Sequence, residues 1–470
     1  MIDFRPYQET AITQTISALK EHRKVLLVSP TGSGKTVMAG GITQRYLSKK
    51  DKKVLVMVHG DELIDQWGQS CYKMFGIKSG IIKSGHKPAR RHRLQIASVQ
   101  TAVRRKPVED VGLIIVDECH RALASSYQKM MEKYPNAYII GWTATPVRSD
   151  GQGFGDVFDK LIVATTKNQL IKDGFLVPFK LFVTSLNPAM LKNVGMKGND
   201  YDEKALGELM QDDTIMANAY KSWKQHADGV QTISFCSSVE HARSVAQMFQ
   251  DEGVNAAMVC GETPSWERKN IVNQFRAGKI TYLANMGVFT EGFDVKSVGA
   301  VQLLRATKSY GLYSQMIGRG MRIYEGKEHC ILLDHGNNWI EHGLPNHEPK
   351  WSLYKTPEKD ETEIVMIKKE NEEGVIEIIP AFRSELPNFV DELEVLEADM
   401  TFRQDLIDAC FEYAERKGHK RSSAYYNFSK GLERHGDMPT IAELHYFRME
   451  MGYDPYWVRA QAKELGVKTL

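Results

Sequence analysis

Short runs of aliphatic and β-branched residues recur along the first part of the chain, separated by longer stretches with helical periodicity. The first set covers residues 25–28, 54–58, 95–99, 113–116 and 138–141. Runs that are apolar at every position are typical of strands buried on both faces. Their alternation with helices predicts a mostly parallel sheet with helices on both sides.

A second alternating block begins near Phe179. Its apolar runs cover residues 231–235, 256–259, 280–283, 300–304 and 330–333. We therefore expect two α/β domains in series, residues 1–175 and residues 176–345. The glycine-rich segment 151–155 reads as a flexible loop between them.

The pattern changes beyond residue 345. Residues 346–400 are expected to be an acidic linker or accessory region, since residues 351–400 hold 5 Lys/Arg against 14 Asp/Glu. Residues 401–470 predict a small, mostly helical domain with helices near 402–416 and 440–450. Its mixture of aromatic and basic residues suits either single-stranded nucleic acid or a helical domain with its own aromatic core.

The charge distribution and the cysteines indicate what kind of partner and which cellular compartment to expect. The whole chain has a net charge of +2, but residues 1–350 alone carry +10. This excess suits a polyanionic partner, although a solvated positive face would look the same. The six cysteines include no Cys-x-x-Cys pair, so we expect no structural zinc site. Their scatter along the chain fits reduced thiols in a cytoplasmic compartment. No signal peptide and no membrane-spanning run is recognised, so we expect a cytoplasmic protein with no membrane partner, either in a bacterial cell or as a phage protein in the host cytoplasm.

The loop after residues 25–28 carries the pattern of a phosphate-binding loop. A glycine-rich turn between a strand and a helix surrounds phosphate with backbone N–H groups at the helix's positive end. Lys35 would add charge at the outer phosphates, and Thr36 would offer a hydroxyl to magnesium. Ser29 stands where the general pattern has its first glycine. The candidate nucleotide-binding residues here are Thr31, Gly32, Ser33, Gly34, Lys35 and Thr36.

An acidic pair, Asp117 and Glu118, follows the apolar run 113–116. At the tip of a strand beside the phosphate loop, Asp117 would hold magnesium together with Thr36. Glu118 would then orient and deprotonate the attacking water. The alternative is a solvated acidic turn. Together, the loop and the acidic pair predict an enzyme driven by nucleoside triphosphate.

Further ordered segments carry a family resemblance. They are Arg5-Pro6-Tyr7-Gln8, residues 56–67, Ser98-Val99-Gln100-Thr101, Thr143-Ala144-Thr145-Pro146, residues 235–242, residues 285–294 and residues 315–322. With the phosphate loop and Asp117-Glu118-Cys119-His120, they resemble the motifs of superfamily 2 helicases, in the group that includes XPB, UvsW and RadD. The resemblance covers roughly residues 3–345. It implies two tandem RecA-like domains that bind ATP and Mg²⁺ between them.

The resemblance also implies a role for each matching residue. Arg5 and Gln8 would read adenine, Gly292 and Asp294 would contact the nucleotide, and His120, Thr143 and Thr145 would couple hydrolysis to movement. Gln315, Arg319 and Arg322 would act on the phosphates from the second domain, with the two arginines on one helical face. The implied nucleic-acid contacts are His59, Ser98, Gln100, Thr101, Ser237 and Thr290. The family often has Arg where this chain has Gly60.

We therefore expect an ATP-dependent DNA helicase or translocase that acts on branched or single-strand-containing DNA in repair, recombination or replication. Its partners would be DNA, bound through sequence-independent backbone contacts, and single-strand-binding or other repair and replication proteins. An RNA helicase remains an alternative. A motor subunit of a restriction or defence complex is another, and it would require a partner nuclease, since no nuclease motif is recognised here.

Overall fold

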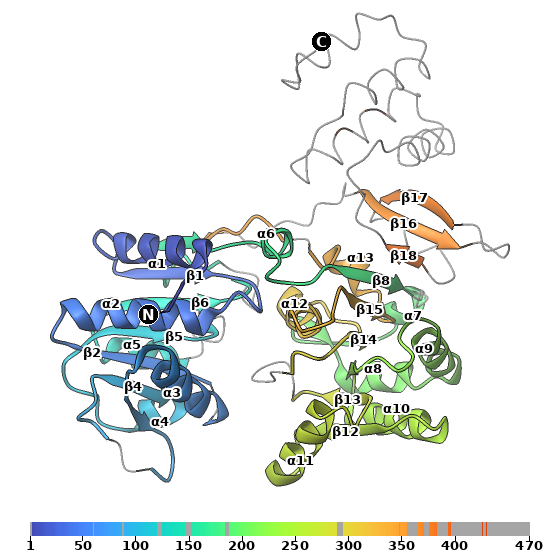
Figure 1. Ribbon diagram of the computed structural model, residues 1–470, viewed down its shortest axis with the longest axis horizontal. Helices are drawn as coiled ribbons and strands as arrows, with labels where there is room; N and C mark the ends of the chain where they lie inside the picture. Colours follow the sequence, from blue (N-terminus) through green and yellow to red (C-terminus); the bar gives the residue numbers. More distant parts are fainter. Residues whose placement is uncertain are drawn as a thin grey trace, which may run out of the picture.

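Two parallel-sheet lobes lie side by side in the computed structural model (Figure 1). The structure describes residues 2–59, 61–86, 89–119, 125–146, 153–183, 188–288, 295–346 and 348–354, the segments 364–370, 376–382 and 393–395, and residues 425 and 429. The expected α/β architecture with two parallel-sheet domains is confirmed. The two helices expected at 402–416 and 440–450 lie outside the described residues.

The first lobe is a seven-stranded parallel sheet in the order β3-β4-β2-β5-β6-β1-β7. Its strands are β1 (Lys24–Val28), β2 (Lys53–Val58), β3 (Ser79–Ile82), β4 (Leu94–Ser98), β5 (Val111–Val116), β6 (Tyr138–Thr143) and β7 (Lys160–Val163). Its helices are α1 (Pro6–Ala18), α2 (Lys35–Lys49), α3 (Asp61–Phe75), α4 (Val99–Arg104) and α5 (Ser125–Glu132).

Both faces of this sheet are covered, as the apolar runs predicted. Along β1, Leu26 and Val28 pack into one apolar cluster, and Val25 and Leu27 pack into another. All five apolar runs of the first lobe are strands. The edge strands β3 and β7 were not expected, because partly exposed positions interrupt their apolar pattern.

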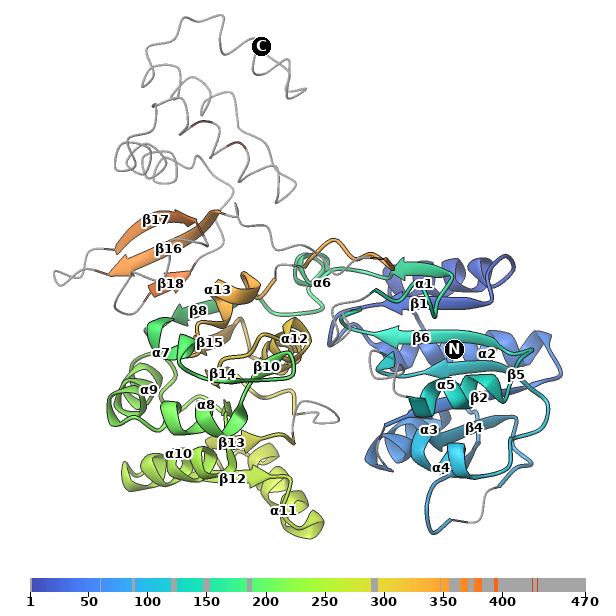
Figure 2. The same cartoon turned by 180° about the vertical axis from the view of Figure 1, so that it is seen from behind.

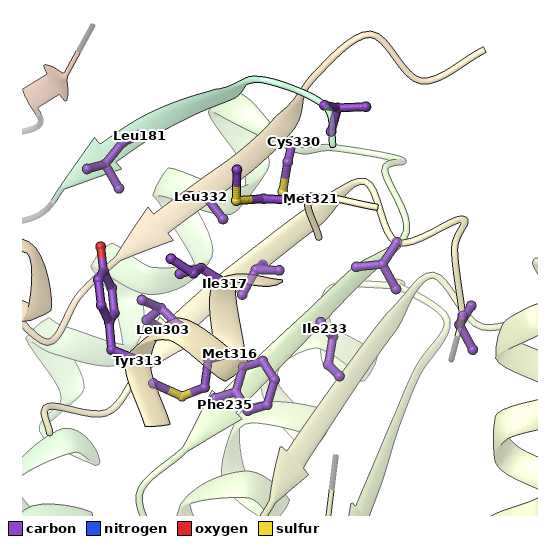
Figure 3. Packing of buried hydrophobic residues seen from close by; sticks show 14 of the residues in the cluster. Leu181, Ile233, Phe235, Leu303, Tyr313, Met316, Ile317, Met321, Cys330 and Leu332 are labelled. Carbon is purple, nitrogen blue, oxygen red and sulfur yellow. The ribbon is translucent and has the colours of Figure 1, made fainter. Parts of the chain in front are cut away.

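The second lobe holds a nine-stranded sheet in the order β12-β13-β11-β14-β15-β8-β18-β16-β17. The six parallel strands are β8 (Phe179–Val183), β11 (Thr232–Cys236), β12 (Ala256–Cys260), β13 (Tyr282–Met286), β14 (Ala300–Leu304) and β15 (Cys330–Asp334). Its main helices are α9 (Asp213–His226), α10 (Val239–Asp251), α11 (Ser265–Arg276), α12 (Tyr310–Gly318) and α13 (Asn338–His342). Tyr313, Met316 and Ile317 of α12 pack against apolar side chains of the sheet (Figure 3).

Two further parts extend the second lobe. β16 (Ile364–Glu370), β17 (Ile376–Phe382) and β18 (Leu393–Val395) continue the sheet through antiparallel pairing of β18 with β8. These strands lie in the segment expected to be an acidic linker or accessory region. Residues 188–210, between β8 and α9, form an insert of α7 (Pro188–Lys192), the hairpin β9 (Met196–Lys197) and β10 (Asp200–Tyr201), and α8 (Glu203–Met210).

The chain passes between the lobes twice. The first crossing follows β7 and contains α6 (Lys167–Lys172), and residues 343–354 return to the first lobe (Figure 1). Leu353 is buried in the core of the first lobe, and its carbonyl oxygen accepts a hydrogen bond of 2.8 Å from the Gly155 backbone N–H. At the crossing, Lys167 Nζ donates to Tyr310 Oη at 3.2 Å and to Pro345 O at 2.9 Å.

The expectation that residues 151–155 form a flexible loop between the domains was wrong for the described residues 153–155. Phe154 is fully buried in the first lobe, and β7 follows it and joins the first sheet. A Cβ at Gly153 would lie 2.0 Å from the carbonyl oxygen of Leu353, so the glycine permits close backbone packing rather than mobility.

Truncation of the returning segment should destabilise the first lobe. Leu353→Ala removes a side chain that is 6% exposed, and we expect a loss of about 2–4 kcal/mol in unfolding free energy. Urea unfolding of the full chain measures it. Ile323→Ala, at a position 41% exposed, is the control and should cost less than about 1 kcal/mol. Equal effects of the two substitutions would contradict the packing described.

None of the helices in the described parts of the chain is long and apolar enough to cross a membrane.

Candidate active site at the lobe junction

The loop between β1 and α2 has the backbone geometry of a phosphate cradle. Gly32 and Gly34 have φ values of 89° and 80°, a region that glycine enters at little cost. A Cβ at Gly34 would lie 2.6 Å from Nε2 of Gln8, so a side chain there would have to displace the Gln8 amide. Gly34 is the N-cap of α2, which places Lys35 and Thr36 in the first helical turn. The loop and the positive end of the helix thus converge as an anion site.

Ser29, at the position of the usual first glycine, has a structural role. It is fully buried, and its Oγ accepts a hydrogen bond of 3.0 Å from Trp142 Nε1. Its backbone N–H donates to Thr143 O at 3.0 Å. Trp142 and Thr143 end β6, so Ser29 fixes the phosphate loop to the neighbouring strand.

The acidic pair lies beside this loop, at the end of β5. Lys35 Nζ is 2.9 Å from Glu118 Oε1. Glu118 has a φ of 48°, unusual for a residue with a side chain. Asp117 Oδ1 accepts a hydrogen bond of 3.0 Å from the Glu118 backbone N–H, and Asp117 Oδ2 accepts one of 2.9 Å from Trp67 Nε1. The structure therefore brings together the lysine and both carboxylates that the sequence predicted.

Trp67 was not predicted as a site residue. Its only signal was its place at the end of segment 56–67, which the family resemblance assigned to the nucleic-acid strand. Trp67 is 3% exposed on α3 and orients the Asp117 carboxylate. Burial, and next the Glu118 carboxylate, raise the pKa of Asp117, whereas Lys35 and the Trp67 indole lower it.

The predicted adenine-reading residues brace the phosphate loop. Gln8 Nε2 donates to Ser33 O at 3.0 Å, and Gln8 Oε1 accepts from the Arg5 backbone N–H at 3.1 Å. Tyr7 Oη also donates to Ser33 O, at 2.6 Å. The Arg5 guanidinium stacks on Phe175, 4.0 Å from the ring centroid. Phe175, on the first crossing between the lobes, was missed, because nothing in its local pattern indicates this contact.

Two contacts bring the arginine segment of the second lobe to the phosphate loop. A Cβ at Gly318 would lie 2.8 Å from Thr31 Cβ, so the end of α12 packs directly on the loop. Leu176 forms an antiparallel bridge with Arg322, and its Cδ2 lies 2.9 Å from where a Cβ on Gly32 would be. Gln315 and Arg319 are 8% and 6% exposed on this segment.

The expectation that Arg319 and Arg322 share one helical face was wrong. The helix α12 ends at Gly318, with Arg319 as its C-cap, and Arg322 lies beyond it in the bridge with Leu176. Gly320 packs against Cys330, where a Cβ would approach Sγ to 2.3 Å, so the chain turns toward the sheet instead of continuing the helix.

The described coupling residues lie between the two lobes. Thr143, the last residue of β6, and Thr145 just beyond it are buried, and Thr143 Oγ1 exchanges hydrogen bonds of 3.0 Å with the backbone of Thr145. Thr145 Oγ1 lies 2.9 Å from where a Cβ on Gly311 of α12 would be. The other residues predicted around this junction, His120, Thr290, Gly292 and Asp294, lie outside the described residues.

The described residues that we predicted to contact nucleic acid lie at or just beyond the carboxyl ends of parallel strands, as the phosphate loop and the acidic pair do. His59 follows β2, while Ser98 ends β4 and leads into α4 with Gln100 and Thr101. Ser98 Oγ is 3.1 Å from Gln100 Oε1. Ser237 follows β11, but it is fully buried and its hydroxyl donates to Leu304 O at 3.0 Å. In this structure its side chain holds the second lobe together, and its predicted nucleic-acid contact stays a prediction.

Two family models match the chain. The one described as type III restriction enzyme, res subunit, matches residues 1–148, and the helicase conserved C-terminal domain matches residues 213–324. A 51.5 kDa protein of Lactococcus phage (isolate 7-9) is 35% identical over 70% of this chain and 69% of its own length. The IRC3 protein of Saccharomyces cerevisiae, named as an ATP-dependent helicase, is 31% identical over 70% of this chain and 51% of its own length.

One more distant sequence relative and one solved structure are also similar to this chain. The ATP-dependent DNA helicase uvsW of Enterobacteria phage T4 is 23% identical over 70% of this chain and 67% of its own length. An HsdR-subunit fragment of a type I restriction enzyme from Vibrio vulnificus YJ016 shares the fold, with a TM-score of 0.56 and 22% identity over 73% of this chain and 66% of that one.

Two parallel-sheet lobes with a phosphate loop, an acidic pair and an opposing arginine segment define a nucleoside-triphosphate-driven motor enzyme. The chain belongs to the superfamily 2 helicases, a family of ATP-dependent enzymes. It spans about half the length of the yeast relative.

Removal of the Trp67 hydrogen bond should weaken Mg²⁺ binding while leaving Asp117 and the other predicted site residues in place. Trp67→Phe keeps an aromatic ring but leaves Asp117 Oδ2 without its indole donor. Because partners of a metal-holding carboxylate tune its affinity, we expect roughly tenfold more Mg²⁺ for half-maximal ATP hydrolysis. Trp223→Phe is the matched control, since it removes a buried indole hydrogen bond of 2.8 Å to Thr232 in the other lobe. An unchanged Mg²⁺ requirement in Trp67→Phe would show that the indole does not position Asp117.

Proposed function

We propose that this chain is an ATP-dependent DNA helicase or translocase that couples hydrolysis to movement on branched or single-strand-containing DNA. The contact of Gly318 with Thr31 carries the proposal, because it places the second lobe's arginine segment on the phosphate loop. A nucleotide held there would be touched from both lobes. Its binding and hydrolysis would then change how the lobes meet.

The first lobe offers a fitting set of groups for ATP and Mg²⁺. The loop amides and Lys35 suit phosphate oxygens, and the buried Ser33 Oγ has no hydrogen-bond partner in the described part of the chain. Thr36 and Asp117 supply the hydroxyl and carboxylate oxygens that Mg²⁺ prefers. Bound Mg²⁺ would offset the charge of the phosphates.

The pair of Lys35 with Glu118 suggests how the site is kept inactive before ATP binds. Lys35 Nζ holds Glu118 Oε1 at 2.9 Å, and neither side chain is more than 17% exposed. Phosphate oxygens would draw Lys35 away and release the carboxylate. Glu118 would then accept a proton from the attacking water. Arg319 and Arg322 would neutralise charge on the transferred phosphoryl group from the other side.

A relative's name, the charge of the chain and the candidate contact residues support DNA as the nucleic acid that this protein binds. The uvsW relative is named as a DNA helicase, and residues 1–350 carry a net charge of +10, which suits a phosphate backbone. The candidate contacts at His59, Ser98, Gln100 and Thr101 would bind backbone without reading sequence. A restriction motor is the second candidate, favoured by the family model over residues 1–148.

Hydrolysis by the purified chain, with single-stranded, duplex or forked DNA or with RNA, tests the proposal. We expect DNA to stimulate turnover strongly, with forks giving the largest effect. Lys35→Ala and Glu118→Gln should reduce the stimulated rate by at least about a hundredfold. Stimulation by RNA alone would overturn the DNA assignment. A normal rate in either variant would overturn the site, and co-purification of a nuclease would favour the restriction motor.

A further inference from the structure

Arg305 is a buried guanidinium that the proposed motor leaves unused. It directly follows β14, whose residue Leu304 pairs in register with Cys236 at the end of β11. Arg305 and Ser237 therefore sit side by side at the carboxyl edge of the second sheet. This is the edge where the family resemblance places contacts with the nucleic-acid backbone.

The described surroundings of Arg305 leave one of its buried hydrogen-bond donors, Nε, unsatisfied. The residue is 8% exposed, and its buried Nε has no hydrogen-bond partner among the residues that the structure describes. Among the described residues, the carboxylate that faces its charge is that of Glu203, with Oε1 3.7 Å from Arg305 Nη2. A guanidinium presents five donors in a fixed fork that matches a phosphate. Leaving one of these donors buried without a hydrogen bond is costly.

Glu203 belongs to the insert, residues 188–210, which covers this edge of the second lobe (Figure 2). Asp200 anchors the insert, because it accepts hydrogen bonds from Thr307 Oγ1 at 2.6 Å and from the Lys308 backbone N–H at 2.8 Å. Ala306 packs among the insert's apolar side chains. The insert is therefore fixed to the three residues that directly follow Arg305.

Glu203 itself is held loosely. Its side chain is 60% exposed, and the distance of 3.7 Å exceeds that of a hydrogen bond. The carboxylate can swing into solvent without unpacking the insert. Glu203 thus neutralises Arg305 weakly. The guanidinium remains available to an anion that can accept hydrogen bonds from it.

We propose that Arg305 binds a backbone phosphate of the DNA strand and that Glu203 occupies this position until DNA arrives. The inference rests on the proposed function, because it deepens how the second lobe grips the strand. It predicts opposite effects for the two residues. Loss of Arg305 weakens DNA binding, whereas neutralisation of Glu203 strengthens it.

The test is binding of a fluorescent oligothymidine to the full-length chain without ATP, over a series of salt concentrations. Arg305→Gln should weaken binding roughly tenfold. It should also reduce the slope of log affinity against log salt by about 0.7, as for one lost phosphate contact on a single strand. Glu203→Gln should tighten binding a few-fold. Arg305→Lys should fall between wild type and Arg305→Gln, since it keeps the charge but not the fork.

Two control variants make the same charge changes at exposed positions elsewhere in the second lobe. Arg276→Gln removes an exposed arginine from α11, and Glu208→Gln removes an exposed carboxylate from α8. Both should leave affinity and salt slope near wild type. Equal slopes and affinities for wild type, Arg305→Gln and Glu203→Gln would overturn the inference and make Arg305 a structural residue. Failure of the wild-type chain to bind any oligothymidine would instead overturn the proposed function, and this inference with it.

Discussion

The two lobes meet where Gly318 of α12 lies on Thr31 of the phosphate loop. A Cβ at Gly318 would come within 2.8 Å of Thr31 Cβ, so a side chain there would push the lobes apart. The same helix approaches Thr145 through Gly311, where a Cβ would lie 2.9 Å from Thr145 Oγ1. One short helix therefore contacts both the phosphate loop and the segment after β6. Every proposal for movement depends on this close approach.

The second constraint is the double connection between the lobes. The chain leaves the first lobe through α6 and returns to bury Leu353 in its core. Where the two crossings meet, Lys167 is buried, and burial lowers its pKa to about 8. Its amine donates to Tyr310 of α12 and to Pro345 of the returning segment. A change in the position of α12 would thus act on both crossings at once.

The sequence predicted those parts of the structure whose signal is local. The runs 25–28 in β1 and 113–116 in β5 are apolar at every position because both faces of the sheet are covered, and their residues pack into two separate clusters. The phosphate loop and the acidic pair stood out because glycine, lysine and carboxylate carry chemistry in a fixed local pattern. The parallel order of β1, β5 and β6 then brings them to one edge.

What the sequence could not indicate depends on packing between distant segments. Trp67 is fifty residues from Asp117, and only the placement of α3 beside β5 brings the indole to the carboxylate. The spacing of Arg319 and Arg322 predicted a shared helical face only if the helix continued. Instead α12 ends at Gly318, and the chain then packs against Cys330 through Gly320. The sequence did not single out Arg305 either, because its burial next to the insert depends on how the insert packs against the segment after β14.

The central claim is that arginines of the second lobe act on ATP bound to the first. The most direct measurement compares Arg322→Ala with wild type in single-turnover ATP hydrolysis and in ATP affinity. The account predicts a rate lower by at least about a hundredfold, with ATP affinity changed far less. Loss of rate and affinity in equal proportion, or no loss of rate, would contradict it.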